Sequence, residues 1–218
     1  MEFVQANEQM LEQYAADIPE LVHATGPVSY DYHFPKRKIF DALVTHSWRT
    51  PSTLFAAEAT RLAIEDGELL GIEIGFHGIE YRQRIAALSP AWAEILAAGI
   101  ANPADVQEVL EHSDHASWLN PVIGEGTYYV HALSVKPAAR GKRVGMQLLS
   151  NAIESARQQG FGKLQLDVLS DNPAVNFYQS MGLTLLVESR APIPERHGVP
   201  PEWRMGIVLD RGFGSFKN

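Results

Sequence analysis

The stretch from Leu133 to Gly145, LSVKPAARGKRVG, constrains the fold of this chain more than any other. It begins with residues typical of a β-strand, Pro137 would end that strand, and a short loop with Gly141 leads into a segment of helical periodicity. The first N–H groups of such a helix lack intrahelical partners, and the helix dipole adds partial positive charge there. The sequence therefore predicts a phosphate site at this strand–loop–helix junction.

The same stretch is basic, although the chain is acidic overall. Lys136, Arg140, Lys142 and Arg143 place four cations within eight residues of a protein whose formal charge is −8. That balance argues against a nucleic-acid partner, which is held mainly by clustered Lys and Arg. The glycine spacing matches neither the dinucleotide nor the P-loop motif. A solvated, basic helix start explains the stretch equally well until the downstream sequence is considered.

Periodicity predicts a mixed α/β fold. Asp66-Gly67 lies between two β-compatible runs and indicates an antiparallel hairpin over residues 60–76. Residues 78–121 change to an Ala- and Leu-rich helical pattern, which we interpret as a helical insertion in a single domain covering residues 1–218. Further helices are expected over 8–22 with a break at Pro19, 39–46, 143–159 and 174–181, and further strands over 126–135, 163–169, 183–189 and 203–209.

Bulk properties exclude several classes of protein. The N-terminal residues do not form a signal peptide, and no apolar run approaches the roughly 20 residues of a membrane span. We therefore expect a cytoplasmic protein with no membrane partner. The absence of cysteine excludes disulfides, thiolate metal sites and cysteine nucleophiles. The sequence leaves a homodimer open.

Two ordered motifs resemble those of a known family. LSVKPAARGKRVG from Leu133 is followed some 27 residues later by NPAVNFYQSMG, which begins at Asn172. Together they resemble motifs A and B of the GNAT acetyltransferase superfamily over about the last 90 residues. The resemblance implies a largely antiparallel central sheet flanked by helices, acetyl-CoA as cosubstrate, and an amine as acceptor.

The resemblance also implies which residues bind acetyl-CoA. The loop amides would hold the pyrophosphate, the backbone of the preceding strand would pair with the pantetheine arm, and Asn172 would hydrogen-bond that arm. Asn172 is also a good helix N-cap, which is compatible with this role. The residues assigned to acetyl-CoA are Leu133, Ser134, Val135, Arg140, Gly141, Lys142, Arg143, Val144, Gly145, Asn172, Ala174, Phe177 and Tyr178.

The loop departs from the family pattern at one position. The stricter form of the motif has glycine where this chain has Arg143, so only Gly145 of the two glycines is present. A backbone amide is still available from Arg143. The departure leaves open whether the Arg143 side chain contacts a phosphate.

Tyr178 and His131 are the catalytic candidates. Tyr178 would protonate the departing thiolate, because a phenol with a pKa of about 10 stays protonated at neutral pH. His131 would take the proton of the amine; HALSV from His131 resembles the corresponding strand of arylalkylamine acetyltransferases, and alternation places His131 on one face with Tyr129, Leu133 and Val135. Both side chains could instead be core residues. Glu73 and Glu125 are the reserve bases, and a backbone N–H near Leu133 would meet the oxyanion.

Other features are weaker. His112 and His115 could share a helix face but have no evident third ligand, so we expect no metal. No G-x-S-x-G elbow supports a serine hydrolase. The alternatives to a small-molecule acetyltransferase are an acyl-CoA-binding sensor or scaffold and a protein or peptide acetyltransferase. Aromatic residues that could line an acceptor pocket or belong to the core are Tyr30, Tyr32, Phe34, Trp48, Trp92 and Trp118.

Overall fold

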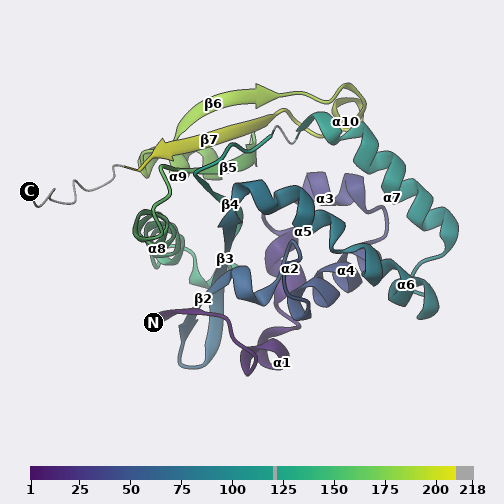
Figure 1. Cartoon of the computed structure of the whole chain (residues 1–218), viewed down its shortest axis with the longest axis horizontal. Coiled ribbons are helices and arrows are strands. Elements are labelled where there is room, and N and C mark those ends of the chain that lie inside the picture. Colours follow the sequence, from purple (N-terminus) through teal and green to yellow (C-terminus); the bar gives the residue numbers. More distant parts are fainter. Residues whose placement is uncertain (120–121, 210–218) are drawn as a thin grey trace, which may run out of the picture.

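A seven-stranded sheet forms the centre of the computed structural model, which describes residues 1–119 and 122–209 (Figure 1). The strand order is β1-β2-β3-β4-β5-β7-β6, and every neighbouring pair is antiparallel except β4 with β5. This arrangement confirms the predicted mixed fold with a largely antiparallel sheet. The strands are β1 (Glu2–Gln5), β2 (Thr60–Glu65), β3 (Glu68–His77), β4 (Thr127–Val135), β5 (Lys163–Leu169), β6 (Thr184–Ser189) and β7 (Glu202–Val208).

Helices lie on both sides of the sheet. In Figure 1, α8 lies on one side of β3 and β4, and α2 to α7 lie on the other. No helix in the described ranges is long and apolar enough to cross a membrane. The α-helices are α1 (Met10–Tyr14), α2 (Ile18–His23), α3 (Pro27–His33), α4 (Arg37–Arg49), α5 (Tyr81–Ala86), α6 (Ser89–Ala97), α7 (Pro103–His115), α8 (Val144–Gln158), α9 (Ala174–Ser180) and α10 (Pro192–Arg196). Short 3₁₀ turns are η1 (Ala57–Ala59), η2 (Gly78–Glu80), η3 (Ser117–Leu119) and η4 (Pro137–Ala139).

Local chemistry explains several element boundaries. The β2–β3 hairpin turns at Asp66 and Gly67, whose φ angles of 52° and 80° are those a two-residue turn of this hand requires. Helix α7 begins at a capping box, in which the side chains of Asn102 and Asp105 each accept the other's backbone N–H at 3.0 Å. Gly160, with φ of 82°, follows the end of α8, where a left-handed residue commonly ends a helix.

Three elements were not expected from the sequence. β1 extends the sheet beside β2, and α3 and α10 form in segments rich in aromatic residues and proline. The helix expected over residues 8–22 is two short helices, because the chain turns between them and Pro19 lies in the first turn of α2. These elements are short, so tertiary packing rather than local periodicity decides them.

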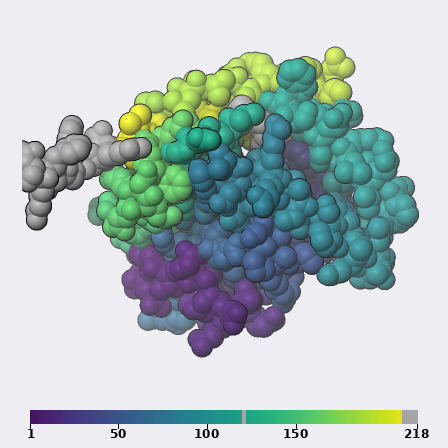
Figure 2. Space-filling view, in the orientation of Figure 1, coloured from purple at the N-terminus to yellow at the C-terminus, as the bar shows by residue number. Residues whose placement is uncertain are grey.

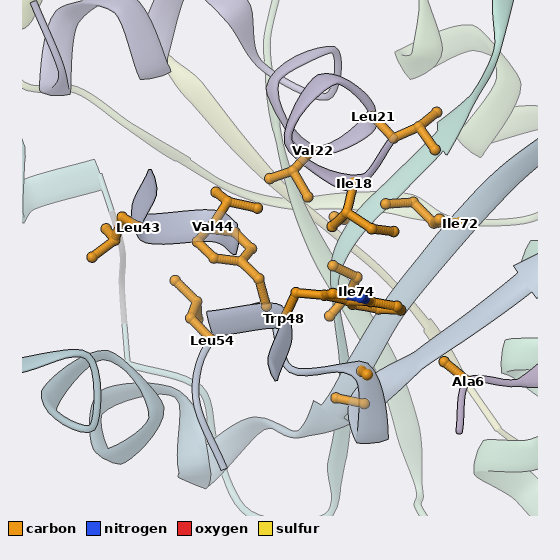
Figure 3. Packing of buried hydrophobic residues seen from close by; sticks show 14 of the residues in the cluster. Ala6, Ile18, Leu21, Val22, Leu43, Val44, Trp48, Leu54, Ile72 and Ile74 are labelled. Atoms are coloured by element: carbon orange, nitrogen blue, oxygen red, sulfur yellow. The ribbon is translucent and has the colours of Figure 1, made fainter. Parts of the chain in front are cut away.

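One hydrophobic core lies between the sheet and α1, α2, α4 and α6. Trp48, 1% exposed, lies beside Ile74 of β3, and its indole N–H donates to the Leu11 carbonyl at 3.0 Å (Figure 3). Ile18 and Val22 of α2 reach the same cluster. This core fixes α2 against the sheet and so positions the segment that follows α2.

A second core lies on the other side of the sheet. Leu149, Ala152, Ile153 and Ala156 of α8 are buried there with β4, β5 and β7, and they form one apolar face of the helix. Figure 2 shows α5 to α7 (blue-teal to teal) along one flank and β6 and β7 (yellow-green) along the upper edge. The site described next lies between these two cores.

Candidate active site

A cavity opens where β4 and β5 stop pairing. The two strands are hydrogen-bonded in parallel only from Thr127–Val130 to Lys163–Leu166. Beyond that point the strands diverge, and a cavity of about 800 Å³ is lined by the backbones and side chains of both. Residues 133–135 pair with β3 along one edge, and their other edge borders this cavity. An extended ligand can therefore add to β4 through main-chain hydrogen bonds.

The loop before α8 supplies backbone donors at one end of the cavity. Gly141 and Arg143 both have left-handed backbone angles, with φ of 80° and 63°. The amides of Arg140 and Lys142 donate within the loop, and the Gln147 amide donates to the Arg143 carbonyl at 3.1 Å. The amides from Arg143 to Met146 have no backbone acceptor among the described residues. This end of the cavity can receive an anion.

Twelve of the thirteen residues expected to bind acetyl-CoA line the cavity; the exception is Lys142. Lys142 lies in the loop but is exposed and points outside the lining, because the left-handed turns at its two neighbours reverse the chain there. Lys136 is also directed elsewhere, since its ammonium pairs with Asp17 at 2.6 Å. The cations at the cavity are therefore Arg140 and Arg143.

Gly145 allows a test that separates binding from folding. A Cβ at this position would meet only Val135 at 3.4 Å and Phe177 at 3.9 Å, which are ordinary contacts. We expect Gly145→Ala to keep or raise the melting temperature, because Ala favours the helix. Because the added methyl would lie at the predicted pyrophosphate site, affinity for acetyl-CoA should fall by about tenfold or more. Calorimetric titration and thermal unfolding measure the two effects, and a variant with normal affinity would place the pyrophosphate elsewhere.

Tyr178 reaches the cavity from α9. Its side chain is 7% exposed and packs with Phe177, the ring centres being 5.3 Å apart. Burial raises the pKa of the Tyr178 phenol above its ordinary value of 10. Tyr178 therefore stays protonated at neutral pH and can donate a proton to a strong base formed beside it.

His131 lies at a β-bulge. Ile74 pairs with Ala132 and Gly75 pairs with Val130, so His131 is the extra residue in β4. The prediction that His131 shares one face with Tyr129, Leu133 and Val135 was wrong for the last two. The bulge shifts the alternation, so Tyr129, His131 and Ala132 contact the first core while Leu133 and Val135 pack toward α8.

An aromatic environment surrounds His131 within the cavity lining. The rings of Phe55, Phe76, Tyr81 and Tyr129 lie 5.2 to 6.2 Å from its own. Its Nε2 is buried without a hydrogen-bond partner among the described residues, and burial lowers the pKa of His131 to about 4. His131 is thus neutral at pH 7, but it is a weak base.

The two reserve bases lie outside the cavity lining. Glu125 is exposed in the loop before β4. Glu73 is 1% exposed and accepts a hydrogen bond from Tyr128 at 3.1 Å on the α8 side of the sheet. Burial raises the pKa of Glu73 to about 7, although Arg61 and the Tyr128 hydroxyl oppose the shift.

Glu73 gives a prediction about stability and pH. Because its folded-state pKa lies above its ordinary value of 4.5, it stabilises the fold fully below about pH 4.5 and loses this contribution as pH rises through 7. The shift corresponds to about 3 kcal/mol of unfolding free energy. We expect Glu73→Gln, which keeps an acceptor for Tyr128 but does not titrate, to flatten the fall in stability between pH 5 and 8. Urea unfolding at both pH values measures this, and an unchanged slope in the variant would contradict it.

Of the six aromatic candidates only Tyr30 lines the cavity. Trp118 is 74% exposed, and Trp48, Phe34 and Trp92 belong to the first core. The ring of Tyr32 packs on that of His112, with 4.7 Å between the ring centres. The backbone carbonyl of Tyr32 accepts a hydrogen bond from the Nδ1 of His112 at 2.6 Å. His112 and His115 form no metal cluster with other described residues.

Sequence reasoning found the acceptor side of the site only in part. It named Tyr30 but no other residue of the segment 24–33, which borders the cavity because the first core holds α2 on the sheet. Tyr81 and Tyr129 supply aromatic surface, and Glu202 supplies a carboxylate from the first position of β7. The alternating pattern around Tyr129 could have indicated that its side chain lies in the site. No sequence pattern indicates this for Glu202, because its position depends on the placement of β7 between β5 and β6.

A family model now identifies the chain. The model for the acetyltransferase (GNAT) family matches residues 31–183, which cover most of the sheet and both motifs around the cavity. The chain belongs to the GNAT acetyltransferase family. It is accordingly an acyltransferase, and the family uses acetyl-CoA as donor. No curated protein matches the chain by sequence.

Several solved structures share the fold of this chain. An N-acetyltransferase from Staphylococcus aureus Mu50 is 18% identical, with a TM-score of 0.68, and the match covers 95% of this chain and 100% of that one. The ribosomal-protein-S18-alanine N-acetyltransferase from Escherichia coli is 15% identical, with a TM-score of 0.54, covering 99% and 98%. A chain of the NatC complex bound to Gag peptide and CoA is 14% identical, with a TM-score of 0.51, covering 96% and 100%.

Proposed function

We propose that this GNAT protein transfers the acetyl group of acetyl-CoA to a primary amine of a small molecule, by direct attack of the amine on the thioester. The observation that carries the proposal is the shared cavity, in which the α8 amides, the unpaired edge of β4 and Tyr178 all face one space. We also propose that residues 1–218 are a single domain with α5 to α7 as an insertion, since strands from both ends of the chain join one sheet.

Acetyl-CoA fits this cavity by the chemistry of its parts. The amides between Arg143 and Met146 would bind the pyrophosphate, and the edge of residues 133–135 would bind the pantetheine amides. Asn172 borders the same space. Its side-chain oxygen already accepts the Ala174 amide at 2.9 Å, and its side-chain NH₂ makes only a long contact of 3.5 Å with the Thr25 carbonyl, which leaves that NH₂ as a donor toward the ligand. This placement directs the thioester toward Tyr178.

The reaction needs groups that handle charge and protons. A backbone N–H of β4 near Leu133 would stabilise the oxyanion that forms when the amine attacks. Tyr178 would give its proton to the sulfur as the carbon–sulfur bond breaks. His131, which stays neutral in its aromatic environment, would take a proton from the nitrogen of the tetrahedral adduct, which is far more acidic than a free ammonium.

Enclosure favours a small acceptor over a protein. The cavity is bordered by residues 24–33, by Tyr81 and by the strands β4 and β5. An acceptor must therefore enter between the side chains of these segments. Two of the solved structures above concern protein or peptide acceptors, so a peptide amine is the second candidate. Their fold alone is shared with this chain and does not choose between the two.

The test is release of free thiol from acetyl-CoA by the purified protein. The acceptors are arylalkylamines, polyamines, aminoglycosides, amino acids and short peptides, each compared with buffer alone. Amine-dependent release with small amines supports the proposal, and release only with peptides would favour the second candidate. Saturable binding of acetyl-CoA with no release from any acceptor would indicate a sensor.

A further inference from the structure

One carboxylate in the cavity lining, that of Glu202, has a buried oxygen and no role in the acetyl-transfer steps proposed above. Glu202 begins β7, where it pairs with Leu169 of β5 and Ser189 of β6, and it lines the same cavity as Tyr178. Its Oε2 is buried and has no hydrogen-bond partner among the described residues. A buried carboxylate oxygen without a donor is unfavourable in a folded protein unless a ligand provides one.

The nearest cation is already committed to another carboxylate. Arg204 donates to both oxygens of Asp167, at 2.8 Å and 2.6 Å, and the Tyr129 hydroxyl donates to Asp167 at 2.9 Å. Both charged side chains of this pair are 5% exposed. The guanidinium still attracts Glu202 electrostatically, but two carboxylates share one cation, so this end of the cavity has room for one more positive charge.

The other titratable groups around Glu202 do not supply that charge. Burial lowers the pKa of both His33 and His131, so these cavity histidines are neutral at pH 7. Arg140 and Arg143 lie on the loop before α8, and the charged groups that act on Glu202 are Asp167 and Arg204 instead. None of these groups therefore supplies a cation to the Glu202 carboxylate, whereas a bound molecule can.

Aromatic rings lie around the same carboxylate. Tyr30, Tyr81 and Tyr129 all line the cavity. Burial is the main cause of the raised pKa of each phenol, and the negative charge of Glu202 raises it further. The three rings are therefore near the carboxylate. Tyrosine faces attract a cation and pack against an apolar body. The surroundings of Glu202 therefore suit an organic ammonium.

We propose that Glu202 binds the ammonium group of the acceptor and removes its first proton, and that the acceptor is an amine that is cationic in solution and carries an apolar or aromatic body. This inference rests on the proposed acetyl transfer and names its substrate class. It also divides the protons between two residues, since the ammonium nitrogen must lose two protons to become an amide.

The ammonium gives one proton to the Glu202 carboxylate, the amine attacks the thioester carbon, and the adduct gives its second proton to His131. The carbon–sulfur bond breaks and the thiolate takes the Tyr178 proton. Glu202 and His131 then release their protons and Tyr178 regains one, so that one proton is released per acetyl group. Burial raises the pKa of Glu202 above its ordinary value, which brings it nearer to that of an amine and eases the first transfer.

The decisive variant is Glu202→Gln, with Glu111→Gln as the matched control. Glu111 is exposed on α7 and outside the cavity lining. Initial rates are measured with 2-phenylethylamine, with the best acceptor from the panel above, and with an arylamine, which carries no charge at neutral pH. We expect Glu202→Gln to lower kcat/KM for the cationic amines by about 10- to 100-fold, as for loss of a charged hydrogen-bond partner. The KM for acetyl-CoA and the rate with any accepted arylamine should not change.

A structural readout separates this role from a folding role. Because Glu202 has a buried oxygen without a partner, Glu202→Gln should melt at the same temperature as the wild type or higher in the absence of ligand. A lower melting temperature in that variant, or an unchanged kcat/KM for the cationic amine, overturns the inference while leaving acetyl transfer intact. A wild-type preference for uncharged acceptors also overturns it. If the wild type acetylates no amine, the proposed function itself fails.

Discussion

Tyr178→Phe is expected to lower kcat by about 10²- to 10⁴-fold, the range for loss of a general acid, without changing the affinity for acetyl-CoA. The phenylalanine ring keeps the contact with Phe177 and the cavity wall, but it cannot protonate the thiolate. The burial that raises the pKa of Tyr178 keeps the native proton in place across the neutral range, so the defect should not be relieved between pH 6 and 9. Stopped-flow thiol release and calorimetric titration measure the two quantities.

The control for this variant is Tyr14→Phe. Tyr14 is also buried, and its hydroxyl donates to the Gly67 carbonyl at 3.1 Å, far from the cavity lining. Tyr14→Phe should lose about 1 kcal/mol of unfolding free energy but no activity. A Tyr178→Phe variant with wild-type kcat would show that another group protonates the sulfur.

Arg204→Met is expected to have the largest effect on stability, a loss of about 3–5 kcal/mol in the free energy of unfolding. Removing the guanidinium leaves the carboxylate of Asp167 buried with Glu202 nearby, and among the described residues only the Tyr129 hydroxyl then donates to it. Urea unfolding at pH 7 measures the change.

Restoring the charge balance should recover most of that loss. In the double variant Asp167→Asn with Arg204→Met, the charge at position 167 is removed together with that of its partner, and the Tyr129 hydroxyl can still donate to the side-chain carbonyl. We expect this variant to be more stable than Arg204→Met alone. A single variant within 1 kcal/mol of the wild type would mean that the pair contributes little to the fold.

The parts of the site that could be predicted are those encoded in adjacent residues. The loop from Arg140 to Gly145 and the Asn172–Tyr178 segment owe their places to local strand, turn and helix signals, and both line the cavity. Strand alternation was less secure at His131, because a single extra residue in β4 moves every later side chain to the other face. The sequence around His131 has no glycine or proline to mark that bulge.

The acceptor side could not be predicted, because it is assembled from distant segments. Glu202 meets Tyr30, Tyr81 and Tyr129 only after β7 is placed between β5 and β6 and α2 is packed on the sheet. Strand order is a property of the whole sheet, and a lone glutamate after two prolines carries no period that would indicate a buried site. Most of the aromatic residues chosen from the sequence belong to hydrophobic cores, because sequence patterns do not distinguish a core position from a cavity position.

The central claim is that acetyl moves from coenzyme A directly to an amine in this cavity. The most direct measurement mixes the protein with acetyl-CoA labelled with ¹³C in the acetyl group and with the best acceptor amine, and follows free thiol, N-acetylated product and intact protein mass together. We predict equal amounts of thiol and labelled amide, formed only when the amine is present, with no acetylated protein. Thiol release without an amine, or a labelled protein that forms before the product, would contradict direct transfer.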